Sequence, residues 1–587
     1  MIPSSCRRLD PGSKLSVICL VSLSTVVLFF GAGCQAQQAH FDAATEPSNP
    51  VTTPAPTLDT SAIVAQAAQA VEAQLATTQP VTTTAPVSNQ ITVPQEELLR
   101  FIPDPIDVKL KDITRSREVR LSLQECLNRT AASNFGIRTE SYGPAISAMD
   151  ILKAEAAFDA VYFADAAHDK INQPTSSELA SGNNEQTNLA TGIRKLLPTG
   201  GAISGAYNLT RLDTELQFAT LNPSYTNNFA AELRQPLLRG LGLDVNRASV
   251  DVAKNNMRIA KHEFHKKLRD VLTDVERTYW RLVQARRDVV IQKDLVDQTK
   301  ETQEILNARR GYDVTSAMIA RATSLSAIRL ADYEQVLSQV KNLEDRLKAL
   351  MNDPELNQGN DIEIIPTDSP SVGPIILDST TEVQAAMENR VELKQSKLNI
   401  DNTRINIAVA KNQALPRFDL TFRYTVNGLG GNAGQAFDQM TTSNFQDYHI
   451  GISFEYPIGN RAARAGEKKA ILQRDQAIAA LKSLIENIIL EVHTSVRNLQ
   501  TAYRQVQPRK ESVEAARENV ESLDLRTVAL NPSFLDVKLS AQETLAQARR
   551  GLLSALVDYR IAVVDLERAK DTLLKYDNVV IEPTQAR

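Results

Sequence analysis

The sequence predicts a mixed α and β membrane protein built twice from one unit, in which an amphipathic helix leads into a strand pair and then into a long helical hairpin. Glycine and proline are scarce, with 23 and 25 residues in a chain of 587, which favours long helices. Apolar residues recur at steps of three and four from about residue 243 to 309, as they do in an amphipathic helix. Half of the aromatic residues fall in 155–236 and 418–457, where apolar and polar residues alternate as in strands.

Charge and hydropathy exclude several classes of protein. The 65 Lys plus Arg and 70 Asp plus Glu give a net charge of -5, which supplies no general field for nucleic acid. After residue 34 no segment is apolar over the ~20 residues that a membrane helix needs. We therefore expect no nucleic-acid partner, and a polytopic helical membrane protein is excluded.

The first 33 residues have the composition of a secretory signal peptide. Arg7, Arg8 and Lys14 precede the apolar run 15–30, and small residues then lead to Cys34. A cysteine in this place resembles the acylated cysteine of bacterial lipoproteins; the alternative is an ordinary signal peptide with an incidental cysteine. We expect Cys34 to be lipidated. Residues 34–95, rich in Pro, Thr, Ala and Gln, are expected to form a disordered tether.

Two copies of the unit account for most of the remaining chain. Each begins with an amphipathic helix, continues into aromatic strands and ends in a helical hairpin whose near-heptad pattern indicates coiled-coil packing. The expected boundaries are a first copy at 96–350 (strands at about 158–236, hairpin at about 243–350), a connecting equatorial segment at 351–380, a second copy at 381–575 (strands at about 418–457, hairpin at about 462–575) and a tail at 576–587.

A proline and a glycine mark the turn from strand to helix in each copy: Pro236 with Gly240, and Pro457 with Gly459. One strand pair per copy gives about four strands, which are too few to close a barrel. Because open sheet edges are not tolerated in hydrocarbon, several chains have to share one barrel, and the helical hairpins then continue it as a tube. Alternatives are a globular β domain and a cell-envelope structural lipoprotein with a periplasmic coiled-coil scaffold.

Four short segments carry a family resemblance: Gln235–Gly240, Glu388–Leu393, Tyr456–Ala465 and Ala541–Ala548. In this order they resemble the TolC-type outer membrane efflux proteins, and Cys34 resembles the lipoprotein branch of that family. The resemblance implies a homotrimer with a shared 12-strand β-barrel, continued by a 12-helix periplasmic coiled-coil tunnel. It also implies passive transport from a periplasmic adaptor and an inner-membrane pump of the RND or ABC type, across the outer membrane of a Gram-negative-type bacterium.

The first strand region departs from this pattern. It is about twice as long as the second and holds an additional turn at Pro198–Gly201. The region therefore forms either an extra hairpin beyond the membrane or a strand count that differs from that of the family.

The helical tips carry the candidate functional residues. The resemblance implies acidic residues that narrow the tunnel, and Asp313 and Asp536 are the candidates, with a solvated turn or a helix cap as the alternative for each. Ala317 and Ser540 stand where the family pattern often has acids. The candidate adaptor contacts are Gly311, Tyr312, Thr315, Asn531, Pro532 and Ser533.

Motifs for catalysis are weak. The glycines of 428–433 follow a strand but open no periodic helix, so a dinucleotide site is not expected. His262 and His265 lie one helical turn apart with no third ligand in view, and a solvated helix face explains them. We expect no enzymatic activity, no cofactor and no metal.

Overall fold

The computed structural model describes residues 117–174, 181–216, 218–356, 362–373, 377–442, 444–527 and 532–579. All of these belong to the unit Thr60–Arg587. The predicted signal peptide, the lipidation site Cys34, the tether and the tip residue Asn531 lie outside the described residues.

Each of the two copies runs from shorter helices through strands of one sheet to a long helical hairpin. Long helices of 61 and 67 residues begin the two hairpins and reach about 90–100 Å at 1.5 Å per residue. The helices of the first copy are α3 (Leu123–Ser133), α4 (Phe135–Glu155), the short α5 (Leu243–Asn246), α6 (Ala248–Ala308) and α7 (Ser316–Met351). Those of the second are α8 (Ser379–Asn389), α9 (Val391–Gln413), α10 (Ala433–Thr441), α11 (Arg461–Thr527), α12 (Pro532–Lys570) and the short α13 (Leu573–Tyr576).

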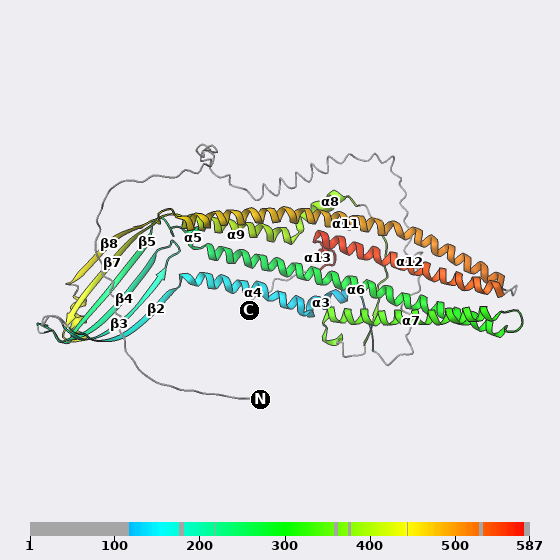
Figure 1. Ribbon diagram of the computed structural model, residues 1–587, viewed down its shortest axis with the longest axis horizontal. Helices are drawn as coiled ribbons and strands as arrows, with labels where there is room; N and C mark the ends of the chain where they lie inside the picture. Colours follow the sequence, from blue (N-terminus) through cyan, green and yellow to red (C-terminus); the bar gives the residue numbers. More distant parts are fainter. Residues whose placement is uncertain are drawn as a thin grey trace, which may run out of the picture. The chain divides into compact units, whose positions relative to one another are not determined.

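A six-stranded antiparallel sheet lies at one end of the long helices (Figure 1). Its order is β2-β3-β4-β5-β7-β8, so that both copies of the unit contribute to one sheet. The strands are β2 (Ala160–Asn172), β3 (Asn183–Leu196), β4 (Ala202–Thr214), β5 (Ser224–Pro236), β7 (Arg417–Gly430) and β8 (Gln446–Glu455).

The expectation of one strand pair in the first copy is wrong, because this copy supplies four of the described strands of the six-stranded sheet. The additional turn at Pro198–Gly201 joins β3 to β4, and Leu197 donates a backbone hydrogen bond to Gly201 across it at 2.6 Å. Gly200 has a φ of 93°, a backbone conformation that glycine adopts without strain. The six described strands of this sheet also depart from the four per chain that a trimeric 12-strand barrel implies.

The two faces of the sheet differ in chemistry. Directly opposed residues share a face, and one row runs Tyr162, Ile193, Gly205, Ala231, Tyr424, Tyr448 from edge to edge. We call the face that holds this row the aromatic face. Its exposed large side chains are Tyr162, Leu189, Ile193, Ile203, Phe229, Leu233, Phe422, Tyr448, Ile450, Ile452 and Phe454.

The opposite face, which we call the polar face, is crossed by ion pairs and amide hydrogen bonds. Arg423 pairs with Glu232 at 2.6 Å across the β5–β7 ladder. Asp419 accepts from Arg234 at 2.5 Å and from Arg417 at 2.9 Å. The Asn208 amide donates to Asn228 at 2.7 Å. Polar groups on this face therefore satisfy one another along the width of the sheet.

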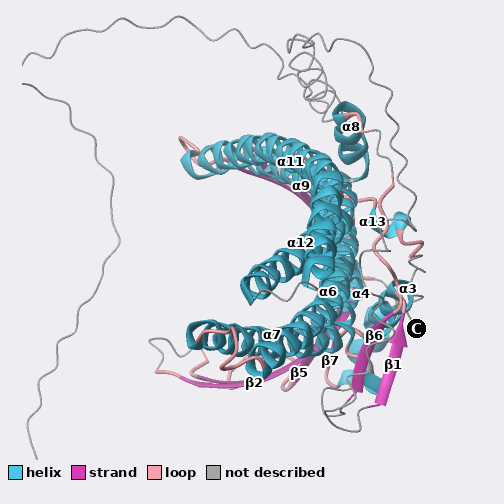
Figure 2. Ribbon diagram, turned by 90° about the vertical axis from the view of Figure 1, so that its right-hand side faces the viewer, coloured by secondary structure: helices cyan, strands magenta, loops and turns pink. Residues whose placement is uncertain are grey.

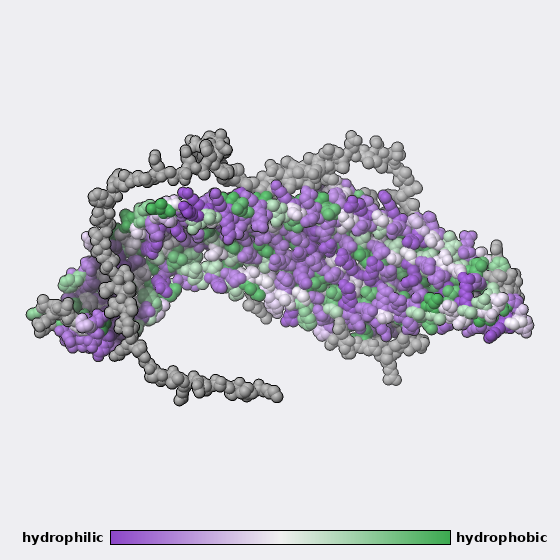
Figure 3. Space-filling model, viewed as in Figure 1, coloured by the Kyte–Doolittle hydropathy of each residue, from purple (hydrophilic) through white to green (hydrophobic). Residues whose placement is uncertain are grey.

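Four helices continue the sheet as a single layer. The α4 helix packs on α6, α6 on α9 and α9 on α11, in an order that matches the strands to which these helices connect. Figure 2 shows the long helices on an arc, with α8, α13, β1 (Arg117–Leu121) and β6 (Ile362–Pro366) on its convex side. The surface over these helices is largely hydrophilic in the view of Figure 3. No described helix combines the length and the apolarity that crossing a bilayer would take.

A buried apolar cluster lies where α6 and α12 pack against each other. Tyr279 and Trp280 are buried there with Leu272 and Leu552, and the two rings meet edge to face with centroids 5.6 Å apart. The Arg560 guanidinium lies 4.9 Å from the centre of the Trp280 ring. The tandem aromatics of α6 are therefore packing residues.

The parallel pair β1 and β6 anchors the start of the first copy to the segment between the copies. The Tyr279 hydroxyl donates to the Asp368 carboxylate at 2.7 Å, and Leu123 donates its backbone N–H to the same carboxylate at 2.6 Å. The segment after β6 is thereby tied to both α6 and α3.

A buried carboxyl group on α7 makes stability depend on pH. Burial raises the pKa of Glu344 to about 7, although Arg286 lies 3.5 Å away. Between pH ~4.5 and ~7 the folded chain holds a proton that the unfolded chain has lost, so the contribution of Glu344 to stability falls as pH rises through this window. The full cost of ionisation is about 3 kcal/mol.

We therefore expect Glu344→Gln to raise the Tm of the detergent-solubilised chain relative to wild type at pH 8 by more than at pH 5. Thermal unfolding followed by circular dichroism measures the difference at both values. A Tm difference that stays the same from pH 5 to pH 8 would contradict the raised pKa.

Candidate functional site

The first helical tip is a tight turn between α6 and α7. Gly311 has a φ of 87° and permits the chain to reverse, and the Thr315 hydroxyl caps α7 by accepting from the N–H of Met318 at 3.4 Å. The side chain of Tyr312 is 90% exposed at the end of the turn. Asp313 pairs with Arg309 of the same turn. The contact of Asp313 is thus local, which favours the turn-stabilising alternative for this residue.

The second tip connects α11 to α12, and its described part begins at Pro532. Asp536 pairs with Arg321 of α7 at 2.7 Å, so this candidate gate residue joins the two helical hairpins. Lys538 pairs with Asp524 at 2.7 Å and joins α12 to α11 within its own hairpin. The structure describes only the backbone of Pro532 and Ser533.

A buried arginine fastens the two hairpins just above the tips. Arg329 of α7 is 2% exposed, and its guanidinium donates to the Leu539 carbonyl of α12 at 2.7 Å. It also donates to the Glu543 carboxylate at 3.1 Å and to the Thr299 hydroxyl of α6. Burial lowers the pKa of Arg329, and the Glu543 charge opposes this effect. Three helices from two hairpins therefore share one guanidinium.

Sequence reasoning missed Arg329, although a signal is present. Ala322, Arg329 and Val336 are spaced by seven residues along α7, and all three are buried. An arginine at a buried heptad position needs partners, because an unpaired charge is costly there. Around it Leu306, Ala322, Leu535 and Leu539 form a small apolar cluster between the hairpins.

The predicted turns from strand to helix are pinned by asparagines. Gly240 has a φ of 89° and donates its N–H to the Asn412 side chain of α9 at 2.7 Å. Gly459 has a φ of 86°, and the neighbouring Asn460 donates to the Ala414 carbonyl at 2.8 Å. Pro236 and Pro457 immediately precede these turns. Each turn is thereby fixed to the end of α9, and the contact at Gly240 ties the first copy to the second.

The edges of the helical layer carry apolar stripes that face no neighbour among the described residues. On α4, the side turned away from α6 holds the α4 stripe: Phe135, Tyr142, Ile146, Met149 and Leu152, which are 54–63% exposed. On α11, the side turned away from α9 holds the α11 stripe of small and apolar residues: Ala465, Leu472, Ala479, Ser483 and Leu490. Spacings of three, four and seven residues are those of coiled-coil seams.

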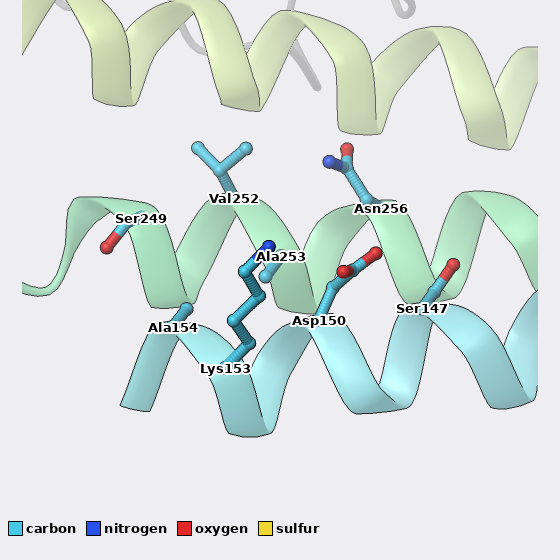
Figure 4. A pocket seen from close by; sticks show the side chains of 8 residues that line it. All are labelled: Ser147, Asp150, Lys153, Ala154, Ser249, Val252, Ala253 and Asn256. Carbon is cyan, nitrogen blue, oxygen red and sulfur yellow. The ribbon is translucent and has the colours of Figure 1, made fainter. Parts of the chain in front are cut away.

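A hollow of about 370 Å³ lies between α4 and α6 beside the α4 stripe. Figure 4 shows its lining, with Asp150 and Lys153 on α4 and Asn256 on α6. None of its side chains is a histidine or a cysteine, and within the described ranges no three potential metal ligands gather. His262 and His265 remain a pair on α6, and burial lowers the pKa of each.

Comparisons with known proteins show what the chain is similar to. Residues 383–570 match the family model described as outer membrane efflux protein. The outer-membrane channel OprN is 15% identical with a TM-score of 0.57, covering 77% of this chain and 90% of its own. The CmeC outer membrane channel of Campylobacter jejuni is 16% identical with a TM-score of 0.56, covering 77% and 86%.

The open state of the Neisseria gonorrhoeae MtrE outer membrane channel is 17% identical with a TM-score of 0.54, covering 79% of this chain and 94% of its own. No curated protein matches the chain in sequence. At these identities the solved structures show the fold alone. The similarity in sequence to the family model is confined to residues 383–570 of the second copy. The chain is thus similar in its second copy to the outer membrane efflux proteins, and in its fold to solved outer membrane channels.

Proposed function

We propose that the chain is the outer membrane channel of a tripartite efflux or secretion system. Three copies form a homotrimer, and solutes or exported cargo pass through it without energy input from the chain. A periplasmic adaptor and an inner-membrane pump of the RND or ABC type deliver the cargo. The observation that carries the proposal is the sheet, whose aromatic face suits lipid and whose polar face suits a water-filled lumen, directly continued by long helices.

The depth of the aromatic face supports insertion into the outer membrane. Along β7 the positions on this face run Phe418, Leu420, Phe422, Tyr424 and Val426. Nine residues from first to last span about 27 Å along the strand, or about 21 Å of membrane depth at a tilt of ~40°. This matches the ~25 Å apolar band of outer membrane barrels. A periplasmic scaffold would have no use for such a face.

The edges of the sheet support a ring of copies. No described strand pairs with the outer edge of β2 or of β8. Because all neighbours are antiparallel and the number of strands is even, β2 and β8 run in opposite directions. The β8 edge of one copy can therefore join the β2 edge of the next in an antiparallel ladder. A ring made in this way leaves no strand edge open to hydrocarbon.

The helical layer has matching edges. The α4 helix leads directly into β2, and α11 directly follows β8, so any ring that joins these strands also brings the α4 stripe to the α11 stripe. Large side chains on the first, such as Tyr142 and Met149, can insert between small ones on the second, such as Ala479 and Ser483. Knob-into-hole packing of this kind would seal the tube between copies.

The same proposal sets the location of the chain. The strands lie in the outer membrane of a Gram-negative-type bacterium in contact with its lipid, and the helices extend into the periplasm. Lipid on Cys34 adds a second anchor on the periplasmic side. The adaptor meets the tips at Gly311, Tyr312 and Thr315 of the first hairpin, and at Asn531, Pro532 and Ser533 of the second.

We place the gate where the two hairpins meet at the tips. Opening requires that the hairpins move apart, so contacts between them hold the closed state, whereas contacts within one turn do not. The ion pair of Asp536 with Arg321 joins the two hairpins. The ion pair of Asp313 with Arg309 stays within one turn. The role of Asp536 as a gate residue is therefore the one that the geometry favours.

We expect Asp536→Ala to raise the release of a small dye from proteoliposomes that carry the full chain, up to about tenfold. An exposed ion pair contributes ~0.5 kcal/mol, and three copies together contribute ~1.5 kcal/mol to the closed state. Asp313→Ala is the matched control and should change release little. If the Asp313→Ala, Asp536→Ala double variant stayed as tight as wild type, neither aspartate would be part of the gate.

A further inference from the structure

We propose that the barrel has 18 strands and is about as wide as the helical tube, so that the exit through the outer membrane does not narrow the conduit. The inference rests on the proposed trimeric channel, and it concerns the size of cargo that this channel passes. It starts from the hairpin β3–β4, which raises the number of described strands in the large sheet of each chain to six.

The hairpin is a full member of the sheet. β3 has 14 residues and β4 has 13, as long as their neighbours β2 and β5 with 13 each. β3 pairs with β2 along its length, and β4 pairs with β5. A hairpin standing outside the membrane would leave β2 beside β5, whereas here it separates them.

The side chains of the hairpin divide between the two faces as those of the other strands do. Leu189, Ile193 and Ile203 lie exposed on the aromatic face. On the polar face the Thr210 hydroxyl donates to Asn188 at 2.9 Å, and the Asn208 amide continues the contact to β5 through Asn228 at 2.7 Å. The hairpin is therefore built to contact lipid on one side and water on the other, at the same depth as its neighbours.

The turn of the hairpin is seated on the helical end of the sheet. Gly242, just before α5, donates its N–H to the Thr199 carbonyl at 3.2 Å. At Gly200 an added Cβ would lie 2.0 Å from the Gly240 carbonyl oxygen, so the two turns are in close contact. Short turns on the periplasmic side are a general property of outer membrane barrels. The hairpin thus enters the membrane from the same side as β2 and β5.

Six strands match the width of the helices below them, and four would not. At a spacing of ~4.8 Å and a tilt of ~40°, each strand takes up about 6.3 Å of perimeter, so six take up about 38 Å and four about 25 Å. The layer of α4, α6, α9 and α11, with axes ~9.5 Å apart, also takes up about 38 Å. The added hairpin therefore lets the sheet continue the helical layer without a taper.

The strand count sets the width of the exit. Three copies of this sheet have 18 strands and a perimeter of about 113 Å, which is a diameter of ~36 Å between backbones and ~26 Å inside the side chains. A barrel of 12 strands would leave ~14 Å by the same arithmetic. The wider exit admits an extended polypeptide chain as well as small molecules, so that the tips set the size limit for cargo.

The direct test is an image of the full-length chain in lipid nanodiscs by electron cryomicroscopy, at a resolution that separates strands. We expect three copies and 18 strands. Three copies with 12 strands would overturn the inference by placing β3–β4 outside the barrel. Two copies with 12 strands would also overturn it while leaving a channel. A chain that stays out of the bilayer would instead overturn the proposed function.

A deletion provides a second, functional test. Residues 183 and 215 are neighbours at the far end of the sheet, where Glu215 donates its N–H to the Asn183 carbonyl, so removing 183–214 joins β2 to β5 through a loop. Both the full chain and the deletion variant carry Arg329→Met, which opens the tips. We expect the largest polymer that enters the pore and lowers its conductance to be about half as wide in the deletion variant, ~14 Å against ~26 Å. An unchanged polymer cut-off in the inserted deletion variant would overturn the inference, and if this variant does not insert, the wild-type strand count decides.

Discussion

Replacing Ile146 and Met149 together by Glu will leave the chain unable to assemble, so that monomers replace the multimer in detergent. Both side chains lie exposed in the α4 stripe of a single copy and become buried where copies meet in the proposed ring. A carboxylate buried without a partner costs about 2–3 kcal/mol or more, and each of the three interfaces would bury two. Mass photometry or light scattering of the purified variant measures the loss.

The matched control is Ile146→Leu with Met149→Leu, which keeps the apolar volume and should leave assembly intact. A flexible thiol cross-linker between Met149→Cys and Leu472→Cys adds a positive test. These two positions lie on opposite edges of one helical layer, so a cross-link joins one copy to the next. A denaturing gel should show cross-linked species of up to three chains. Multimers that survive the two Glu substitutions would refute the α4 stripe as an interface.

Replacing Arg329 by Met will open the tips far more than any exposed substitution. The change removes the hydrogen bonds to the Leu539 carbonyl and to Thr299, and the ion pair with Glu543. Losing one partner of a buried charged network costs about 3–5 kcal/mol. Because Glu543 is partly exposed, we take the loss in stability of the closed tip as ~2 kcal/mol in each copy. Summed over three copies, this shifts the closed and open populations by more than a hundredfold.

Single-channel recording at low voltage measures this effect as a rise in open probability. Arg321→Met is the control, because its ion pair with Asp536 is exposed and its loss should shift the closed and open populations by only about tenfold. The helix content and the mass of the complex should stay those of wild type. If Arg329→Met opened the channel no more than Arg321→Met, the buried arginine would not hold the tips together.

Much of the helical architecture could be predicted because long coiled coils repeat one simple pattern. Residues such as Leu282, Val289 and Val296 recur at heptad steps without an intervening glycine or proline, and all are buried along α6. The strands of the second copy were equally visible, since Phe418 to Tyr424 alternate strongly between apolar and polar residues. In both places a local period is enough to predict the element.

The extra hairpin was harder to predict because its alternation is weak. In β3 the aromatic face carries Leu189, Thr191 and Ile193, while the polar face carries the small Ala190 and Gly192. A strand whose neighbours supply most of the aromatic residues needs few of its own. The place of the hairpin in the sheet follows from the pairing of β3 with β2 and of β4 with β5. The periodicity of a single sequence does not show which strands pair.

The contacts that join the hairpins and the copies depend on three-dimensional proximity. Arg329 and Leu539 are separated by 210 positions in the sequence, and Gly240 and Asn412 by 172. The acidic tip residues could be named in advance, but their partners could not. Arg309 holds Asp313 within its own turn, whereas Arg321 reaches Asp536 across two hairpins. These partners decide which of the two aspartates can act as a gate.

The most direct test of the central proposal is the mass and the conductance of the full chain extracted from outer membranes in detergent. The proposal predicts a complex of three copies that inserts into planar bilayers and conducts in discrete steps of uniform size. A water-soluble single copy without conductance would contradict it.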